Sequence, residues 1–140
     1  MNILDFNESE QKWFDYDTVQ KVWGNDIEIF VVFEVQERED ELKPEERNLK
    51  GVVRPLAEKL KFVEENRKII EETVAEADIE GLTVDDLKSL SITWILFTKY
   101  VDTDECELYL YFGFDPDTTD DAEIAVTINN DNMITVDDLA

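Results

Sequence analysis

The chain has 140 residues, a length typical of one domain, and we expect a single domain over residues 1–140. Hydrophobic residues make up 43% and aromatic residues 11%, enough for a packed core, so the chain is not a disordered acidic polypeptide. The 13 basic and 36 acidic side chains give a net charge of −23, which disfavours direct binding to nucleic acid or to an anionic membrane.

Two residue counts exclude whole classes of chemistry. One cysteine, Cys106, cannot form an intrachain disulfide, and the absence of histidine excludes Ser-His-Asp and Cys-His catalysis. The first residues have neither the basic nor the apolar part of a secretion signal, and no stretch of about 18 apolar residues could span a membrane. We therefore expect a cytoplasmic protein that does not bind membranes.

The first predicted element is a β-hairpin over residues 17–36. Gly24 and Asn25 tolerate the positive φ angles of a tight turn. In the second arm, alternate residues from Ile27 to Val35 are apolar and predict one buried face. The opposite face, which carries Phe30, should be half-buried at most.

Residues 36–48 are rich in charge and predict an exposed loop, and a helix follows over residues 55–79. Its apolar residues recur at helical spacing, so its lysines, Lys59 among them, should lie on a solvated face together with the glutamates. Gly81 should end this segment, and a capping sequence at residues 83–86 predicts one or two further helical turns.

In the rest of the chain, apolar and polar residues alternate as they do in β-strands. The predicted strands span residues 91–101, 107–114, 122–128 and 133–136, joined by short polar turns that favour antiparallel pairing. The sequence therefore predicts an α+β fold. It consists of an antiparallel sheet of five or six strands, made of an N-terminal hairpin and a C-terminal meander, with one main helix packed on one face.

Negative charge is concentrated at the C-terminal end. Residues 101–140 hold 12 acidic side chains and no basic one, and we expect these anions to form a shared patch. Two acidic loops should flank the strand over residues 107–114, whose outer face carries two tyrosines. Acidic groups and tyrosines together favour a basic protein partner. The candidate partner-binding residues are Asp102, Asp104, Glu105, Glu107, Tyr109, Tyr111, Asp115, Asp117, Asp120 and Asp121.

Other chemistry has weaker support in the sequence. The loop over residues 115–121 is similar to the start of a calcium-binding EF-hand loop, but Asp120 stands where that loop needs glycine. A hydrolase that uses two carboxylates remains an alternative, as does a DNA mimic that inhibits restriction enzymes. We assign no catalytic residue, metal ligand or cofactor, and expect that the protein is not an enzyme.

Three segments carry a resemblance to a known group of proteins. They are the hairpin residues 23–29, the helix residues 60–63, and the tail from Phe112 to Pro116 with the strands that follow it. In these segments the chain resembles small uncharacterised bacterial proteins encoded beside polymorphic toxins as immunity proteins. The resemblance implies a protein that binds and neutralises a basic toxin or nuclease and has no catalytic residues of its own.

Overall fold

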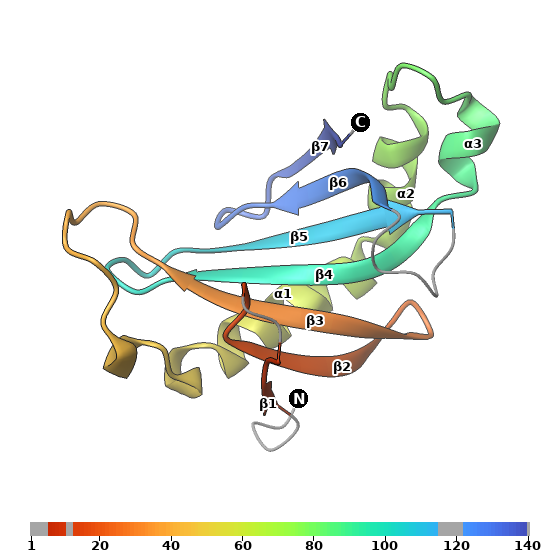
Figure 1. The fold of residues 1–140 in the computed structure, drawn as a ribbon. Coiled ribbons are helices and arrows are strands. Elements are labelled where there is room, and N and C mark those ends of the chain that lie inside the picture. The colour runs from red at the N-terminus through yellow and green to blue at the C-terminus, as the bar shows by residue number, and fades with distance from the viewer. Residues whose placement is uncertain (1–5, 11–12, 115–121, 140) are drawn as a thin grey trace.

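The computed structural model describes residues 6–10, 13–114 and 122–139, and these form one sheet with helices behind it (Figure 1). The strands lie in the sheet in the order in which they occur along the chain, from β1 at one edge to β7 at the other. They are β1 (Asn7–Glu8), β2 (Tyr16–Val22), β3 (Asn25–Glu34), β4 (Ser91–Tyr100), β5 (Cys106–Gly113), β6 (Ala122–Ile128) and β7 (Ile134–Asp138).

The α+β class is confirmed, but the sheet is mixed and has seven strands. β3 and β4 run parallel, whereas every other neighbouring pair is antiparallel. The prediction of an antiparallel sheet was wrong at this junction because β3 and β4 are joined by a long crossover that contains helices. The predicted strand count missed β1, which is only two residues long.

The crossover begins with two short 3-10 turns, η2 (Pro44–Glu46) and η3 (Leu49–Gly51), and then forms three helices. These are α1 (Val53–Glu65), α2 (Arg67–Ala75) and α3 (Val84–Lys88). The single helix predicted for this region is therefore broken at Asn66, which has φ −114° and ψ 23° and whose side-chain amide donates to the Phe62 carbonyl. The capping sequence before α3 is confirmed, because Thr83 and Asp86 exchange side-chain-to-backbone hydrogen bonds.

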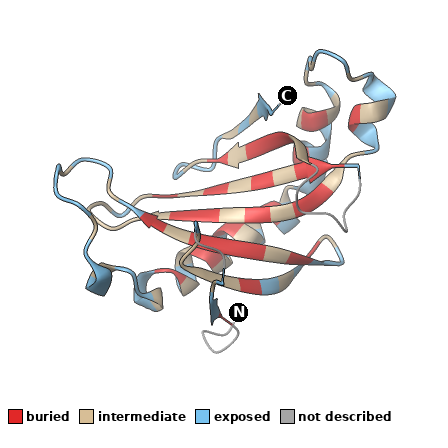
Figure 2. Cartoon of the chain, viewed as in Figure 1, coloured by how far each residue is buried: buried red, intermediate tan, exposed pale blue. Residues whose placement is uncertain are grey.

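The core lies between the sheet and helices α1 and α2. Alternate residues of β3 to β6 point into it and meet Leu56, Val63, Ile70 and Val74 of the helices, all fully or almost fully buried. Figure 2 shows that no residue of β4 or β5 is exposed, so these strands form the centre of the sheet. The sequence periodicity therefore correctly predicted the buried apolar stripe of the helices and the buried faces of the strands.

The hairpin turns one residue earlier than predicted, at Trp23 and Gly24. Both have positive φ, 53° and 84°, as a two-residue turn of this kind requires. Positive φ is unfavourable for a tryptophan, and here contacts with the helices hold the residue in place. The Trp23 indole donates to the Val63 carbonyl at 3.1 Å, its backbone N–H donates to Glu64 at 2.6 Å, and the Arg67 guanidinium lies 5.1 Å from its ring centroid.

Lys59 was expected on the solvated face, and that expectation was wrong. The side chain is only 6% exposed, and its ammonium group donates to the backbone carbonyls of Asn129 and Asn130 and to the side-chain oxygen of Asn132. Burial lowers its pKa. Lys59 therefore donates to three acceptors of the β6–β7 turn and joins α1 to that turn.

Candidate partner-binding face

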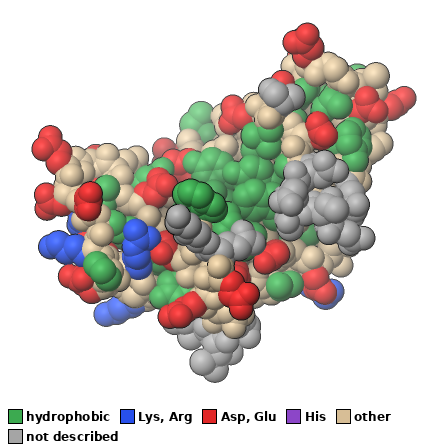
Figure 3. Space-filling model, in the orientation of Figure 1, with side chains coloured by type: hydrophobic (Ala, Val, Ile, Leu, Met, Phe, Trp, Pro, Cys, Tyr) green, Lys and Arg blue, Asp and Glu red, His purple; other side chains and the backbone are tan. Residues whose placement is uncertain are grey.

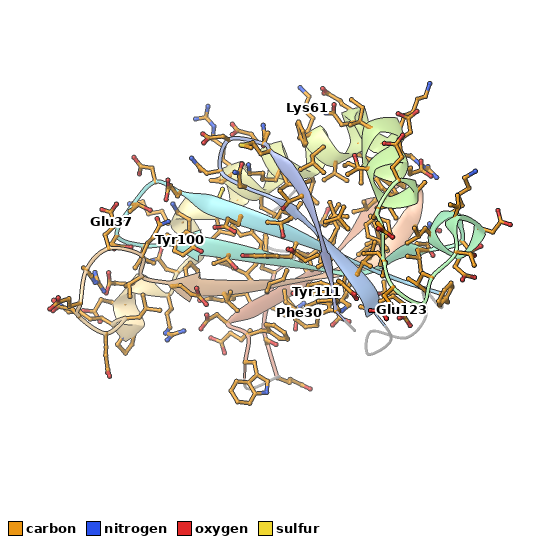
Figure 4. All side chains as sticks on the ribbon, turned by 90° about the horizontal axis from the view of Figure 1, so that it is seen from above. Phe30, Glu37, Lys61, Tyr100, Tyr111 and Glu123 are labelled. Atoms are coloured by element: carbon orange, nitrogen blue, oxygen red, sulfur yellow. The ribbon has the colours of Figure 1, made fainter. Side chains whose placement is uncertain are left out.

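One side of the sheet carries no helix among the described residues, and we call it the open face. Its centre consists of aromatic and aliphatic side chains from three neighbouring strands and from the segment before β2. Figure 4 shows Phe30, Tyr111 and Glu123 on this side, whereas Lys61 projects from the helices on the opposite side. The central residues are Phe14, Phe30, Trp94, Leu96, Tyr109 and Tyr111.

The aromatic rings of the open face are stacked. Trp94 and Tyr111 are register partners, and their rings lie 3.9 Å apart and almost parallel, at 4°. Phe14 stacks on Phe30 with ring centroids 4.3 Å apart, and Phe30 and Trp94 form a T-shaped contact with centroids 5.7 Å apart. These contacts bury Phe30 to 2% exposure, which corrects the expectation that this face of β3 is half-buried at most. The stacks hold a pre-formed apolar surface on a rigid sheet.

Glu107 links two tyrosines of the open face. One carboxylate oxygen accepts from the Tyr109 hydroxyl at 2.7 Å, and the other accepts from the Tyr100 hydroxyl at 3.2 Å. Burial and the nearby carboxylate raise the pKa of Tyr100 to about 12 and also raise the pKa of Tyr109. Both phenols therefore stay protonated at neutral pH, and Glu107 fixes their orientation.

Further carboxylates flank the aromatic centre at both ends of β5. Glu107 lies toward one end of the strand, and by strand alternation Glu28 and Glu123 lie toward the other. Burial, with a smaller effect from Asp17, raises the pKa of Glu28. In Figure 3 apolar side chains occupy the centre of this face with acidic groups around them, while basic side chains gather at the end where η2 and η3 lie.

Asp102 has a structural role in the described chain. Its carboxylate accepts the backbone N–H groups of Gln36, Glu37 and Arg38 at 2.7–2.9 Å, and these bonds lower its pKa to about 2. The loop that follows β3 is thus fixed to the loop between β4 and β5. An ion pair between Arg38 and Glu46 holds the same loop from its other side. We leave Asp102 out of the partner-binding face for this reason.

Asp102→Asn is expected to release this loop. The carboxylate pKa is lower in the folded state than its ordinary value of 3.8, so the stabilisation is present above pH 4 and is lost as the pH falls toward about 2. In the variant, hydrogen exchange at the backbone amides of residues 36–38 should be fast already at pH 6. Asp104→Asn, on an exposed neighbour, is the matched control. Unchanged exchange in Asp102→Asn contradicts the assignment.

Asp104 and Glu105 lie away from the centre of the open face. Asp104 lines a cavity of about 220 Å³ at the end of the sheet, together with Lys59, Cys106 and Asn130. Burial raises the pKa of the Cys106 thiol, so the reactive thiolate is disfavoured there. The eight described acidic residues of the C-terminal region are therefore divided among the loop after β4, the open face, the β6–β7 turn and β7, and do not form the shared patch that we expected.

Part of the open face is predictable from the sequence. The alternation of β5 places Glu107, Tyr109 and Tyr111 on its outer side, as the structure has them, but no partner-binding prediction included Phe14, Trp94 or the other central residues. Trp94 and Leu96 alternate with buried residues in β4, and this alternation was the available signal. The candidate residues Asp115, Asp117, Asp120 and Asp121, and with them the calcium-like loop, lie outside the described residues.

Comparison with protein-family models, with curated proteins and with solved structures finds no match to this chain. Within the described residues, no helix has the length and apolar character needed to cross a membrane. The same residues contain no group of three or more acidic or cysteine side chains arranged to hold a metal ion. The geometry of the open face is therefore the main basis for a functional assignment.

Proposed function

We propose that this protein is a non-catalytic bacterial binding protein of the immunity type, which acts in the cytoplasm and neutralises a basic partner on its open face. The partner class is a basic protein, such as the nuclease domain of a toxin. The observation that carries the proposal is the stacked aromatic surface of β3 to β5 with carboxylates at both ends.

The aromatic centre suits a protein interface. Tyrosine and tryptophan contribute much of the binding energy in protein complexes because they bury a large area and have few rotatable bonds. Trp94, Tyr109 and Tyr111 are each only partly exposed, and stacking and hydrogen bonds already fix their rings. A partner would therefore meet a surface that needs little further ordering, which reduces the entropic cost of binding.

The carboxylates determine which partner fits. Enzymes that act on nucleic acid hold phosphates with lysine and arginine, and those side chains complement Glu28, Glu107 and Glu123. The net charge of −23 attracts a basic protein over long range and raises the association rate, most strongly at low salt. The aromatic centre and the acidic surroundings therefore support the same partner class.

The test uses two double variants with the same change in charge. Glu28→Lys with Glu123→Lys changes the open face, whereas Glu65→Lys with Glu72→Lys changes exposed residues of α1 and α2 on the opposite side. A basic protein is first captured from cells that encode this chain, identified, purified, and titrated against each variant at 50 and 300 mM salt.

We expect the open-face variant to bind the basic partner at least about tenfold more weakly, and the helix-side variant to lose much less. Affinity should fall as salt rises. Equal losses in both variants would mean that the net charge, and no particular face, drives binding. Failure to retain any basic protein at low salt, or an acidic captured partner, would overturn the proposal.

A further inference from the structure

We propose that the outer edge of β7 accepts an extended basic segment of a partner as an additional strand. This surface is different from the open face and does not depend on its function. β7 is the last strand of the sheet, and within the described residues no strand pairs with its outer side (Figure 1).

The hydrogen bonds at the two ends of β7 define which backbone groups point outward. Asn129 N–H donates to the Met133 carbonyl at 3.1 Å, and Leu139 N–H donates to the Glu123 carbonyl at 3.2 Å. Hydrogen-bonded positions alternate along an antiparallel pair, so Thr135 and the other odd-numbered residues of β7 face β6. The N–H and C=O groups of Ile134 and Val136 therefore point away from the sheet, where a new strand would find them.

A groove runs beside this edge. Val136 borders a cavity of about 380 Å³, whose other side consists of the C-terminal part of α2 and the segment after it. Ile79 of that segment, Ile134 and Val136 all pack against the core without being fully buried. An added strand could place alternate apolar side chains on these residues while its backbone pairs with β7.

The charge around the edge of β7 indicates which kind of segment would bind there as an added strand. Glu76, Asp78, Asp137 and Asp138 surround it and are exposed, and residues 69–79 and 129–139 contain no lysine or arginine. A segment that alternates apolar and basic residues would place its apolar side chains in the groove and its basic side chains near these carboxylates. A second copy of the chain does not, because pairing two β7 strands would bring two molecules of charge −23 together.

The probe is a seven-residue peptide with alternating lysine and valine, capped at both ends. We expect it to bind and to slow hydrogen exchange at the amides of Ile134 and Val136, with little change at Thr135, which already donates to β6. The control peptide has the same side chains, but each backbone nitrogen is methylated and cannot donate. It should bind at least about tenfold more weakly, because strand addition depends on backbone hydrogen bonds.

Two double variants test whether the peptide binds at the edge of β7. Asp137→Lys with Asp138→Lys should weaken peptide binding, whereas the open-face variant Glu28→Lys with Glu123→Lys, which has the same change in charge, should affect it much less. This pattern also separates the inference from the proposed function, since either can fail without the other. Equal binding of the methylated peptide, unchanged exchange at Ile134 and Val136, or equal losses in both variants would overturn the inference.

Discussion

Replacing Lys59 with methionine is expected to lower the free energy of unfolding by about 3 kcal/mol. Methionine keeps most of the volume of the side chain, so packing against the core is largely maintained. The loss comes from three oxygens, the carbonyls of Asn129 and Asn130 and the side chain of Asn132, which lose a charged donor in a part-buried site. Urea unfolding at pH 7 measures the effect.

Lys61→Met is the matched control, because Lys61 lies one half-turn away on the same helix and is exposed. Its ion pair with Glu65, at 3.7 Å, is exposed too, and loss of this pair should change stability by no more than about 0.5 kcal/mol. Hydrogen exchange in the β6–β7 turn should also accelerate only in the Lys59 variant. Similar losses in the two variants would show that Lys59 does not hold this turn.

The second large effect is expected from Phe30→Ala, at about 3–5 kcal/mol of unfolding free energy. Phe30 is 2% exposed, and its ring contacts Phe14 and Trp94, so alanine leaves a cavity within the aromatic centre of the open face. Removal of this support should also loosen Trp94. We expect a change in the near-ultraviolet circular dichroism of the folded protein.

Phe114→Ala provides the comparison for Phe30→Ala. Phe114 is 45% exposed and lies just after β5, so the same truncation should cost less than about 1 kcal/mol. Urea unfolding compares the two variants, and both curves are fitted with the same m-value, the slope of unfolding free energy against urea concentration. A small loss for Phe30→Ala would mean that the open face is a loosely packed surface and not a rigid one, and that would also weaken the proposed function.

Local patterns in the sequence were sufficient for most of the fold. The alternation of β3 and β5, the apolar stripe of the helices and the capping sequence at Thr83 each depend on near neighbours, and the structure has all of them. The parallel pairing of β3 with β4 depends on the path of a long crossover, which no local pattern records. Lys59 was misplaced because its burial depends on carbonyls about seventy residues away.

The candidate site was predictable only along one strand. Alternation within β5 placed Tyr109 and Tyr111 on the outer side, but the partners of these tyrosines come from the register between strands. Trp94 stacks on Tyr111 because the register of β4 and β5 makes them partners, and this register shifts between Ile92 and Trp94; the sequence reveals neither feature. The charge of Asp102 predicted a contact with a partner, but its carboxylate accepts hydrogen bonds from backbone amides of the chain itself.

The attachment of the hairpin tip to the helices has a consequence for the order of folding. Trp23 joins the tip to Val63 and Glu64, residues about midway along the crossover. Once that attachment has formed, the chain between it and the start of β4 is only about half as long as the full connection from β3. Closing a shorter segment costs less entropy, so the slow step of parallel strand pairing becomes easier. The hydrogen bonds of one tryptophan at the hairpin tip thus help β3 and β4, which are distant in sequence, to pair.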